Sequence, residues 1–246
     1  MFFKRSMKSA DSSDGSSQSK IKSLTKTISV KAVAPAPTTP PKGFTIQEKL
    51  PAVYLARQWT KADVNEMNPY APIFSEAISK KQVASVITSW KSLRKISSFE
   101  TKAGVIIMRK IFKLSKPLRV HFGFPHNADP EEPIVYHNKN FVMHGMRLIS
   151  MIDTTIEFLE KEDLESLELE LEDLGRRHVR MKVMPDDFPV LGRALIQTLQ
   201  TALGDSFNKK ANRSWELIFH FIAYNMVRGL LLELAERSSP PTKIYL

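Results

Sequence analysis

The chain has 246 residues, no cysteine and a formal net charge of +10. Without cysteine it has no disulfide, thiolate nucleophile, zinc–thiolate site or cysteine-ligated iron–sulfur cluster, and nothing in it requires an oxidising compartment. The charge is concentrated in residues 1–43, where eight lysines and arginines against two aspartates give +8 − 2 = +6. No zinc-finger or RNA-recognition signature accompanies these cations, so the charge does not indicate nucleic-acid binding.

Residues 1–43 are predicted to form a disordered basic tail. They contain the Ser-rich stretch "SADSSDGSSQSK" and the Pro-rich stretch "AVAPAPTTPPKG", which offer little apolar surface to bury. The first residues lack the apolar core of a signal peptide, and no apolar run of membrane-spanning length is expected anywhere, so we expect a soluble, cytoplasmic protein. The "FFKR" sequence and the lysines of the tail allow a weak contact with acidic membrane.

Residues 44–78 form a proline-interrupted extension whose structure the sequence leaves open. Its aromatic side chains Tyr54, Trp59, Tyr70 and Phe74 could pack on a neighbouring domain.

Helical periodicity begins at Ser79, and residues 79–237 are predicted to form one all-α domain. "SKKQ" has the form of a capping box and opens the first helix. Apolar residues at helical spacing predict further helices at about 99–114 and 138–159, and Pro185 suits the first turn of one that ends near Leu203. The last helix is predicted to end near residue 237, before a tail of residues 238–246. A polar loop through "NADPEEP" separates the second helix from the third.

One more helix is predicted from leucines that repeat at intervals of three and four residues. They are Leu164, Leu167, Leu171 and Leu174, and His178 continues the same stripe. The acidic residues between them, over 160–173, are typical of a solvated face.

Two histidines lie on apolar helical stripes. His178 follows Leu171 and Leu174, and His144 lies between Phe141 and Leu148. A histidine in such a place is often only a hydrogen-bonded core residue. Two of them facing one dry cavity instead favour a flat apolar cofactor that holds iron between them.

The sequence resembles the globin family over about residues 79–237. "FVMHGMRLISMIDTTIEFL" is similar to the distal helix of the family, "LGRRHVRMKVMPDDFPVLGRAL" to the proximal helix and the one after it, and "HFGFP" to the corner that carries the haem-stacking phenylalanine. The "LGRRH" form is especially similar to neuroglobin-type sequences. Gly104 and Gly145 match the family positions where two helices cross closely. The resemblance implies a globin fold of six to eight helices around a haem pocket, with an N-terminal extension and an insertion within "EKEDLESLELE".

The resemblance also implies roles for individual residues. His178 would be the proximal iron ligand and His144 the distal residue, able to act as a sixth ligand. Phe122 would stack on the haem, and Arg147 would reach a propionate. The remaining pocket side chains would be Met108, Leu148, Leu174, Val183, Phe188 and Leu191. The cofactor would be non-covalent haem b, because no cysteine exists for covalent attachment.

Three functions follow from the resemblance. The first is binding of oxygen or another diatomic ligand for storage, sensing or scavenging. The second is electron transfer or redox signalling with a protein redox partner, with His144 as the sixth ligand. The third is a haem-less helical interaction module. No nucleophilic triad, carboxylate pair or phosphate loop indicates an enzyme, and the sequence leaves the oligomeric state open.

Overall fold

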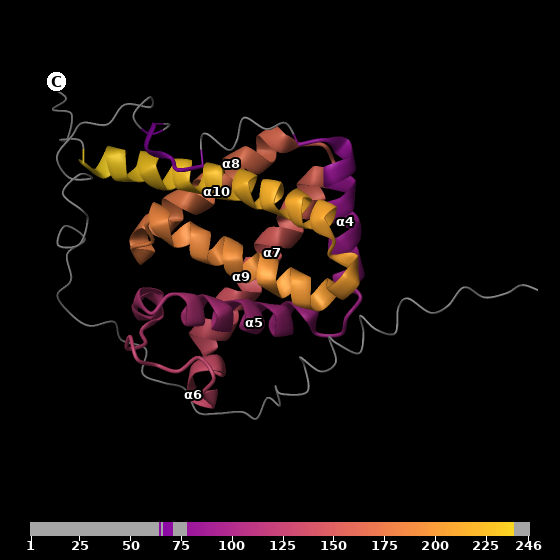
Figure 1. Cartoon of the computed structure of the whole chain (residues 1–246). Coiled ribbons are helices and arrows are strands. Elements are labelled where there is room, and N and C mark those ends of the chain that lie inside the picture. Colours follow the sequence, from indigo (N-terminus) through magenta and orange to yellow (C-terminus); the bar gives the residue numbers. More distant parts are fainter. Residues whose placement is uncertain (1–63, 65, 71–77, 239–246) are drawn as a thin grey trace, which may run out of the picture.

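The computed structural model describes residue 64, residues 66–70 and residues 78–238, and the described part is helical without strands (Figure 1). The longer helices are α4 Lys80–Arg94, α5 Phe99–Leu114, α7 Lys139–Glu160, α8 Leu164–His178, α9 Phe188–Leu203 and α10 Lys209–Ser238. Short elements connect them: η2 Pro117–Phe122, α6 Pro133–Tyr136, η3 Val179–Met181, η4 Pro185–Asp187 and η5 Gly204–Ser206. The tail predicted for residues 1–43 and nearly all of the final nine residues lie outside the described part, as do Tyr54, Trp59 and Phe74.

The six long helices lie where the hydrophobic periodicity predicts them. At the start of α4, the Ser79 backbone N–H donates to Gln82 Oε1 at 2.9 Å and the Gln82 backbone N–H donates to Ser79 Oγ at 3.3 Å, which is the expected capping box. The short elements η2 and α6 occupy the region predicted as loop, because helices of four to six residues are too short to show a period.

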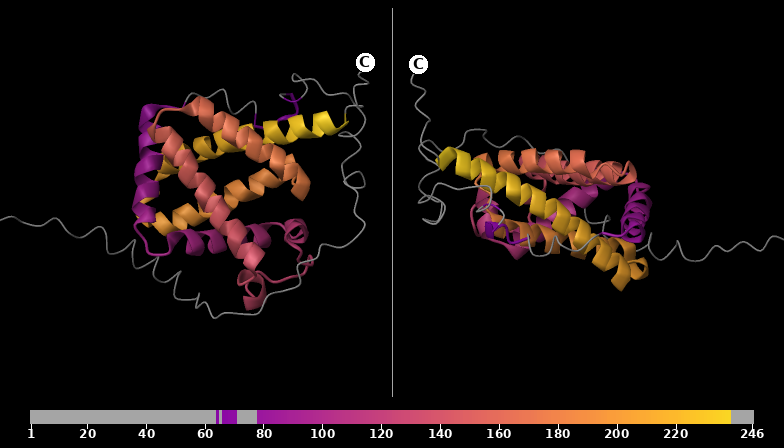
Figure 2. Two further views of the ribbon diagram at one scale, coloured as in Figure 1. Left: turned by 180° about the vertical axis from the view of Figure 1, so that it is seen from behind. Right: turned by 90° about the horizontal axis from the view of Figure 1, so that it is seen from above.

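The helices pack as crossed pairs around one hydrophobic core. α5 lies across α7, α8 crosses α10, and α4 crosses one end of the assembly, where it contacts both α7 and α10 (Figure 1 and Figure 2). α9 packs between α5 and α10. This arrangement is the globin fold, and it brings the C-terminal end of α8 and the N-terminal part of α7 to the same region of the core.

The crossing of α5 and α7 depends on two glycines. A Cβ atom added to Gly145 would lie 2.6 Å from the carbonyl carbon and 2.7 Å from the carbonyl oxygen of Gly104, and one added to Gly104 would meet the Gly145 backbone equally closely. Two helices can approach to this separation only where neither has a side chain. The close crossing expected at these positions is confirmed.

Replacing Gly145 by alanine is expected to lower the free energy of unfolding by about 1–3 kcal/mol, because the new methyl group pushes two backbones apart. The sign of the change in stability is informative, because replacing glycine by alanine inside an unobstructed helix raises stability by roughly 0.5–1 kcal/mol. Urea unfolding followed by circular dichroism measures the change. Ser150→Ala, at an exposed position of the same helix, is the control. A more stable Gly145→Ala protein would contradict the close crossing.

A second pair of glycines, which the periodicity did not indicate, joins α8 to α10. A Cβ on Gly175 would collide with the carbonyl oxygen of Met226, and a Cβ on Gly229 would collide with that of Glu172. Backbone therefore touches backbone at this crossing too. The helix that ends at His178 is held directly against α10.

The stretch "EKEDLESLELE", where an insertion is expected, lies mostly in α8. α7 ends at Glu160 and α8 begins at Leu164, so only residues 161–163 join them. Leu167 is buried at 1% exposure, whereas Leu169 is 66% exposed. The acidic run is thus a helical surface with leucines on its inner side.

The final helix departs from one expectation. Within the described residues, Lys209–Arg237 alone is long and apolar enough to cross a membrane by length and composition, contrary to the expected lack of such a run. Yet 72% of its most apolar window is buried inside the protein. A helix packed on several sides needs apolar residues on more than one face, which raises its overall hydropathy.

A short part of the extension before α4 also belongs to the core. Val64 and Asn68 are each 1% exposed, and Asn68 Nδ2 donates to the Tyr224 carbonyl oxygen at 2.8 Å. The ring of Tyr70 packs against Phe219 and His220, with centroids 6.5 and 5.9 Å away. The packing partner of Tyr70 is therefore α10 of the same chain.

Candidate functional site

The proposed proximal histidine ends α8. His178 Nδ1 donates its proton to the carbonyl oxygen of Leu174, one turn earlier, at 2.7 Å. Because a carbonyl can only accept, this bond places the proton of the neutral ring on Nδ1 and leaves the lone pair on Nε2. Burial lowers the pKa of His178, which outweighs the opposite effect of the bond to Leu174. The imidazole is therefore a neutral potential ligand.

The second histidine lies early in α7. His144 is half-buried, and its ring meets the Phe122 ring edge-on, with 4.9 Å between the centroids. Its pKa is lowered to about 4, first by burial and then by the neighbouring charges of His178 and Arg147. Among the described residues it forms no hydrogen bond. His144 is thus an uncharged imidazole with an uncommitted nitrogen.

The two imidazoles lie near each other. A positive charge on His178 lowers the pKa of His144, so the two side chains lie close enough to interact electrostatically. The described residues hold no cluster of three or more histidine, aspartate or glutamate side chains that could bind a metal ion. Two neutral imidazoles near each other are instead suited to bind a haem iron.

Phe122 is positioned by a buried arginine that sequence reasoning did not single out. Arg119, at 6% exposure, donates from Nε and Nη2 to the Phe112 carbonyl oxygen at 2.9 and 2.6 Å, and from Nη1 to the His126 carbonyl oxygen at 2.6 Å. These bonds tie η2, which ends at Phe122, to the end of α5. A buried arginine that serves backbone carbonyls has no signal in the sequence, where it looks like a solvated charge.

The other predicted pocket residues lie in or against the same core. Met108, Leu148 and Phe188 are buried, at 0%, 7% and 3% exposure. The remaining apolar ones are half-buried and pack against the core: Phe122, Leu174, Val183 and Leu191. Arg147 is exposed on α7, close enough to His144 to influence its pKa.

These residues fit a haem. His178 carries a free Nε2, His144 carries an unpaired nitrogen, both rings are neutral, and the apolar side chains beside them remain partly uncovered. A porphyrin needs an apolar slot with ligands on its two faces and cations near its edge. Fold and site together define a class of protein, an α-helical domain with two neutral imidazoles near each other beside its core.

Comparison with known proteins agrees with the globin fold. Residues 106–226 match the family model for globins. The neuroglobin of Danio rerio is 27% identical over 154 residues, which span 63% of this chain and 93% of that protein, and the neuroglobin of Tetraodon nigroviridis is 29% identical over the same length. A solved structure described as a hexacoordinated heme protein from an anhydrobiotic tardigrade at pH 4 has 19% identity and a TM-score of 0.55, covering 65% of this chain and 97% of that one.

Residues 106–226 form a globin domain, and this domain resembles neuroglobins. The neuroglobin matches confirm the expected neuroglobin-like resemblance.

Proposed function

We propose that this globin binds oxygen or another diatomic ligand at a haem b held by His178, and that His144 takes the sixth position when no external ligand is present. The observation that carries the proposal is the uncharged, unpaired His144 ring, which stands edge-on to Phe122 and near His178. When bound, the haem iron supplies the ligand-binding position and a one-electron redox change.

His178 would serve as the proximal ligand. Its Nδ1–H bond to the Leu174 carbonyl orients the ring and makes Nε2 a better electron donor. The lack of cysteine leaves axial coordination and apolar contact as the means of holding the cofactor. Phe122, fixed through Arg119, would press on one face of the porphyrin, and the exposed Arg147 would bind a propionate at its edge.

His144 would control access on the distal side. The two other side chains assigned to that side, Met108 and Leu148, are buried and have no N–H or O–H group. His144 is therefore the one residue of the three that can donate a hydrogen bond to an incoming ligand. If its nitrogen also coordinates iron, a ligand must displace it first, which slows binding without requiring another gate.

The absorbance spectrum of the purified, reduced, unliganded full-length protein tests the proposal. We expect a low-spin spectrum of the two-histidine type. Adding oxygen should convert it reversibly to the spectrum of the oxygen-bound protein. A high-spin ferrous spectrum would contradict coordination by His144 and favour an open oxygen-binding site. A protein without a Soret band after haem addition would contradict the whole proposal.

Electron transfer to a redox partner is the second candidate, favoured by the same pairing of two imidazoles. A low-spin haem that keeps both ligands changes its coordination little between oxidation states, which suits transfer of one electron. In that case oxygen would oxidise the ferrous protein at once, without a stable liganded spectrum.

Deleting residues 1–43 is expected to leave folding and haem binding unchanged, because the composition of this segment does not offset the entropy of ordering it. Haem content and thermal unfolding of the truncated protein, compared with the full chain, measure both. A truncated protein that no longer bound haem would contradict the division between tail and domain.

The tail is proposed to act in localisation through its net charge of +8 − 2 = +6. Co-sedimentation with vesicles that contain acidic lipid, at low and high salt, is expected to show binding that salt weakens and that the deletion removes. Binding equal in both chains, or insensitive to salt, would contradict a membrane contact by the tail.

A further inference from the structure

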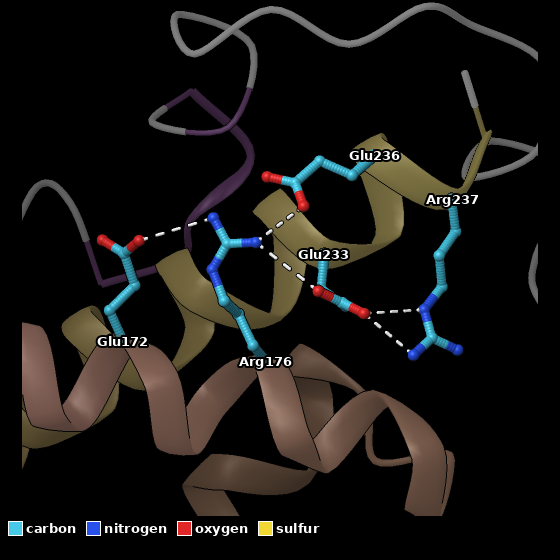
Figure 3. Close-up of polar contacts among 5 residues, drawn as sticks. All are labelled: Glu172, Arg176, Glu233, Glu236 and Arg237. Atoms are coloured by element: carbon cyan, nitrogen blue, oxygen red, sulfur yellow. Dashed lines mark hydrogen bonds and ion pairs between the residues drawn. The ribbon is translucent and has the colours of Figure 1, made fainter. Parts of the chain in front are cut away.

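A cluster of charged side chains joins the C-terminal half of α8 to the end of α10 (Figure 3). Arg176 of α8 donates from Nη1 to Glu236 at 2.8 Å, and the same atom lies 3.5 Å from Glu233. Its Nη2 atom lies 3.6 Å from Glu172, one turn earlier on α8. Glu233 also accepts from Arg237 at 2.8 and 2.9 Å. We call Arg176, Glu172, Glu233 and Glu236 the Arg176 cluster.

Arg176 is two residues before His178, but it faces the other way. Residues two apart on an α-helix point about 200° from each other, because the helix turns once every 3.6 residues. Arg176 accordingly reaches α10, while His178 lies beside the core near His144. One turn of α8 thus carries the proposed ligand on one face and an interhelical tie on the opposite face.

The cluster surrounds the place where the two backbones touch. Gly175, which precedes Arg176, meets the Met226 carbonyl, and Gly229 meets the Glu172 carbonyl. Arg228, which precedes Gly229, pairs with Glu172 at 3.1 Å. Each helix therefore supplies a glycine for the contact and an arginine that binds a carboxylate next to it.

This arrangement restricts how α8 can move on α10. Glu233 and Glu236 are three residues apart, so a single planar guanidinium that binds both resists sliding and rotation of one helix against the other. The Arg176 side chain is 27% exposed and that of Glu233 is 23% exposed, so solvent weakens these contacts less than it does on an open surface. Glycines permit the close approach, but they do not select one register.

We infer that Arg176 is a positioning residue for the proximal ligand. By holding the last turn of α8 on α10, it keeps both the His178 ring and the Leu174 carbonyl that orients this ring in place. The inference rests on the proposed role of His178 as the iron ligand.

The test uses the full-length chain with His144→Leu, in which a five-coordinate ferrous haem shows the iron–imidazole stretching band by resonance Raman spectroscopy. Adding Arg176→Met is expected to shift or broaden this band, and to speed haem loss about tenfold. Arg94→Met is the matched control, because Arg94 also pairs with a carboxylate on another helix, Asp153 of α7 at 3.2 Å, but does not touch α8. The iron–imidazole band of the protein with Arg94→Met should not shift.

Glu236→Gln provides a milder version should Arg176→Met fail to fold. Glu236 is 61% exposed, so the substitution removes one partner of Arg176 without opening the core. A smaller shift in the same direction is expected. An unmoved band in every folded variant of the cluster, or an equal shift in Arg94→Met, would overturn the inference.

Failure of the inference can be told apart from failure of the proposed function. If His178→Ala abolishes the band while variants of the Arg176 cluster leave it unmoved, the ligand assignment stands and the positioning role is wrong. If the band survives in His178→Ala, the ligand assignment is wrong, and the role of Arg176 falls with it.

Discussion

Purified His178→Ala protein is expected to have lost its haem. The substitution removes the ring whose Nε2 lone pair is left free by the Nδ1–H bond to Leu174. Altering a residue that only orients a metal ligand already weakens metal binding by roughly 10- to 100-fold, so removing the ligand should weaken haem binding by more than about 100-fold. The Soret absorbance relative to protein absorbance, and the rate of haem transfer to an acceptor protein, measure the loss.

His126→Ala is the control for this experiment. The His126 side chain is exposed, and the contact it makes to Arg119 uses its backbone carbonyl, which alanine keeps. A second check is His178→Gly with imidazole added to the buffer, which should restore haem binding by filling the vacated position. Unchanged haem content and spectrum in His178→Ala would mean that the iron is held elsewhere.

His144→Leu is expected to convert the reduced unliganded protein from a low-spin to a high-spin, five-coordinate form. Leucine has a similar volume and no nitrogen, so the iron would lose its sixth ligand while the apolar surroundings remain. Carbon monoxide should then bind faster by between about 10-fold and 1000-fold, because an open form populated at roughly 0.1–10% in the parent protein becomes the only form.

Absorbance spectra and stopped-flow mixing with carbon monoxide measure the two effects of His144→Leu. Met143→Leu is the control, since Met143 is the neighbouring residue and lies on the exposed side of α7. If the parent protein and His144→Leu bind carbon monoxide at the same rate, His144 does not occupy the sixth position. Its role would then be limited to hydrogen bonding with a bound ligand.

Several features of the site could be predicted because they follow from the spacing of apolar residues or from a glycine within an apolar helix. The stripe that ends at His178 places the histidine on the inner face of α8 whatever α8 packs against. Gly104 and Gly145 lie in apolar helical segments, where a missing side chain usually marks a close crossing. These features depend on residues a few positions apart, so they can be predicted from the sequence.

Other features depend on contacts between distant parts of the chain. Nothing in the sequence distinguishes Arg119 from a solvated charge, yet the fold buries it among the carbonyls of Phe112 and His126. Tyr70 lies in a proline-interrupted segment without hydrophobic periodicity, and Phe219, which it contacts, lies 149 positions further along the chain. Neither pairing has a spacing that a sequence pattern can reveal.

The sequence by itself determined the helical class, the capping box at Ser79 and the two histidines on apolar stripes, because hydrophobic periodicity and capping act within a few residues of the chain. Only the tertiary structure decided that Gly175 and Arg176 hold α8 against α10, and that His144 and His178 lie near each other in an environment that keeps both neutral. The physical reason is that burial, charge pairing and backbone contact depend on distances in space. Residues far apart in the chain can be close in space, so the spacing of residues along the sequence does not give these distances.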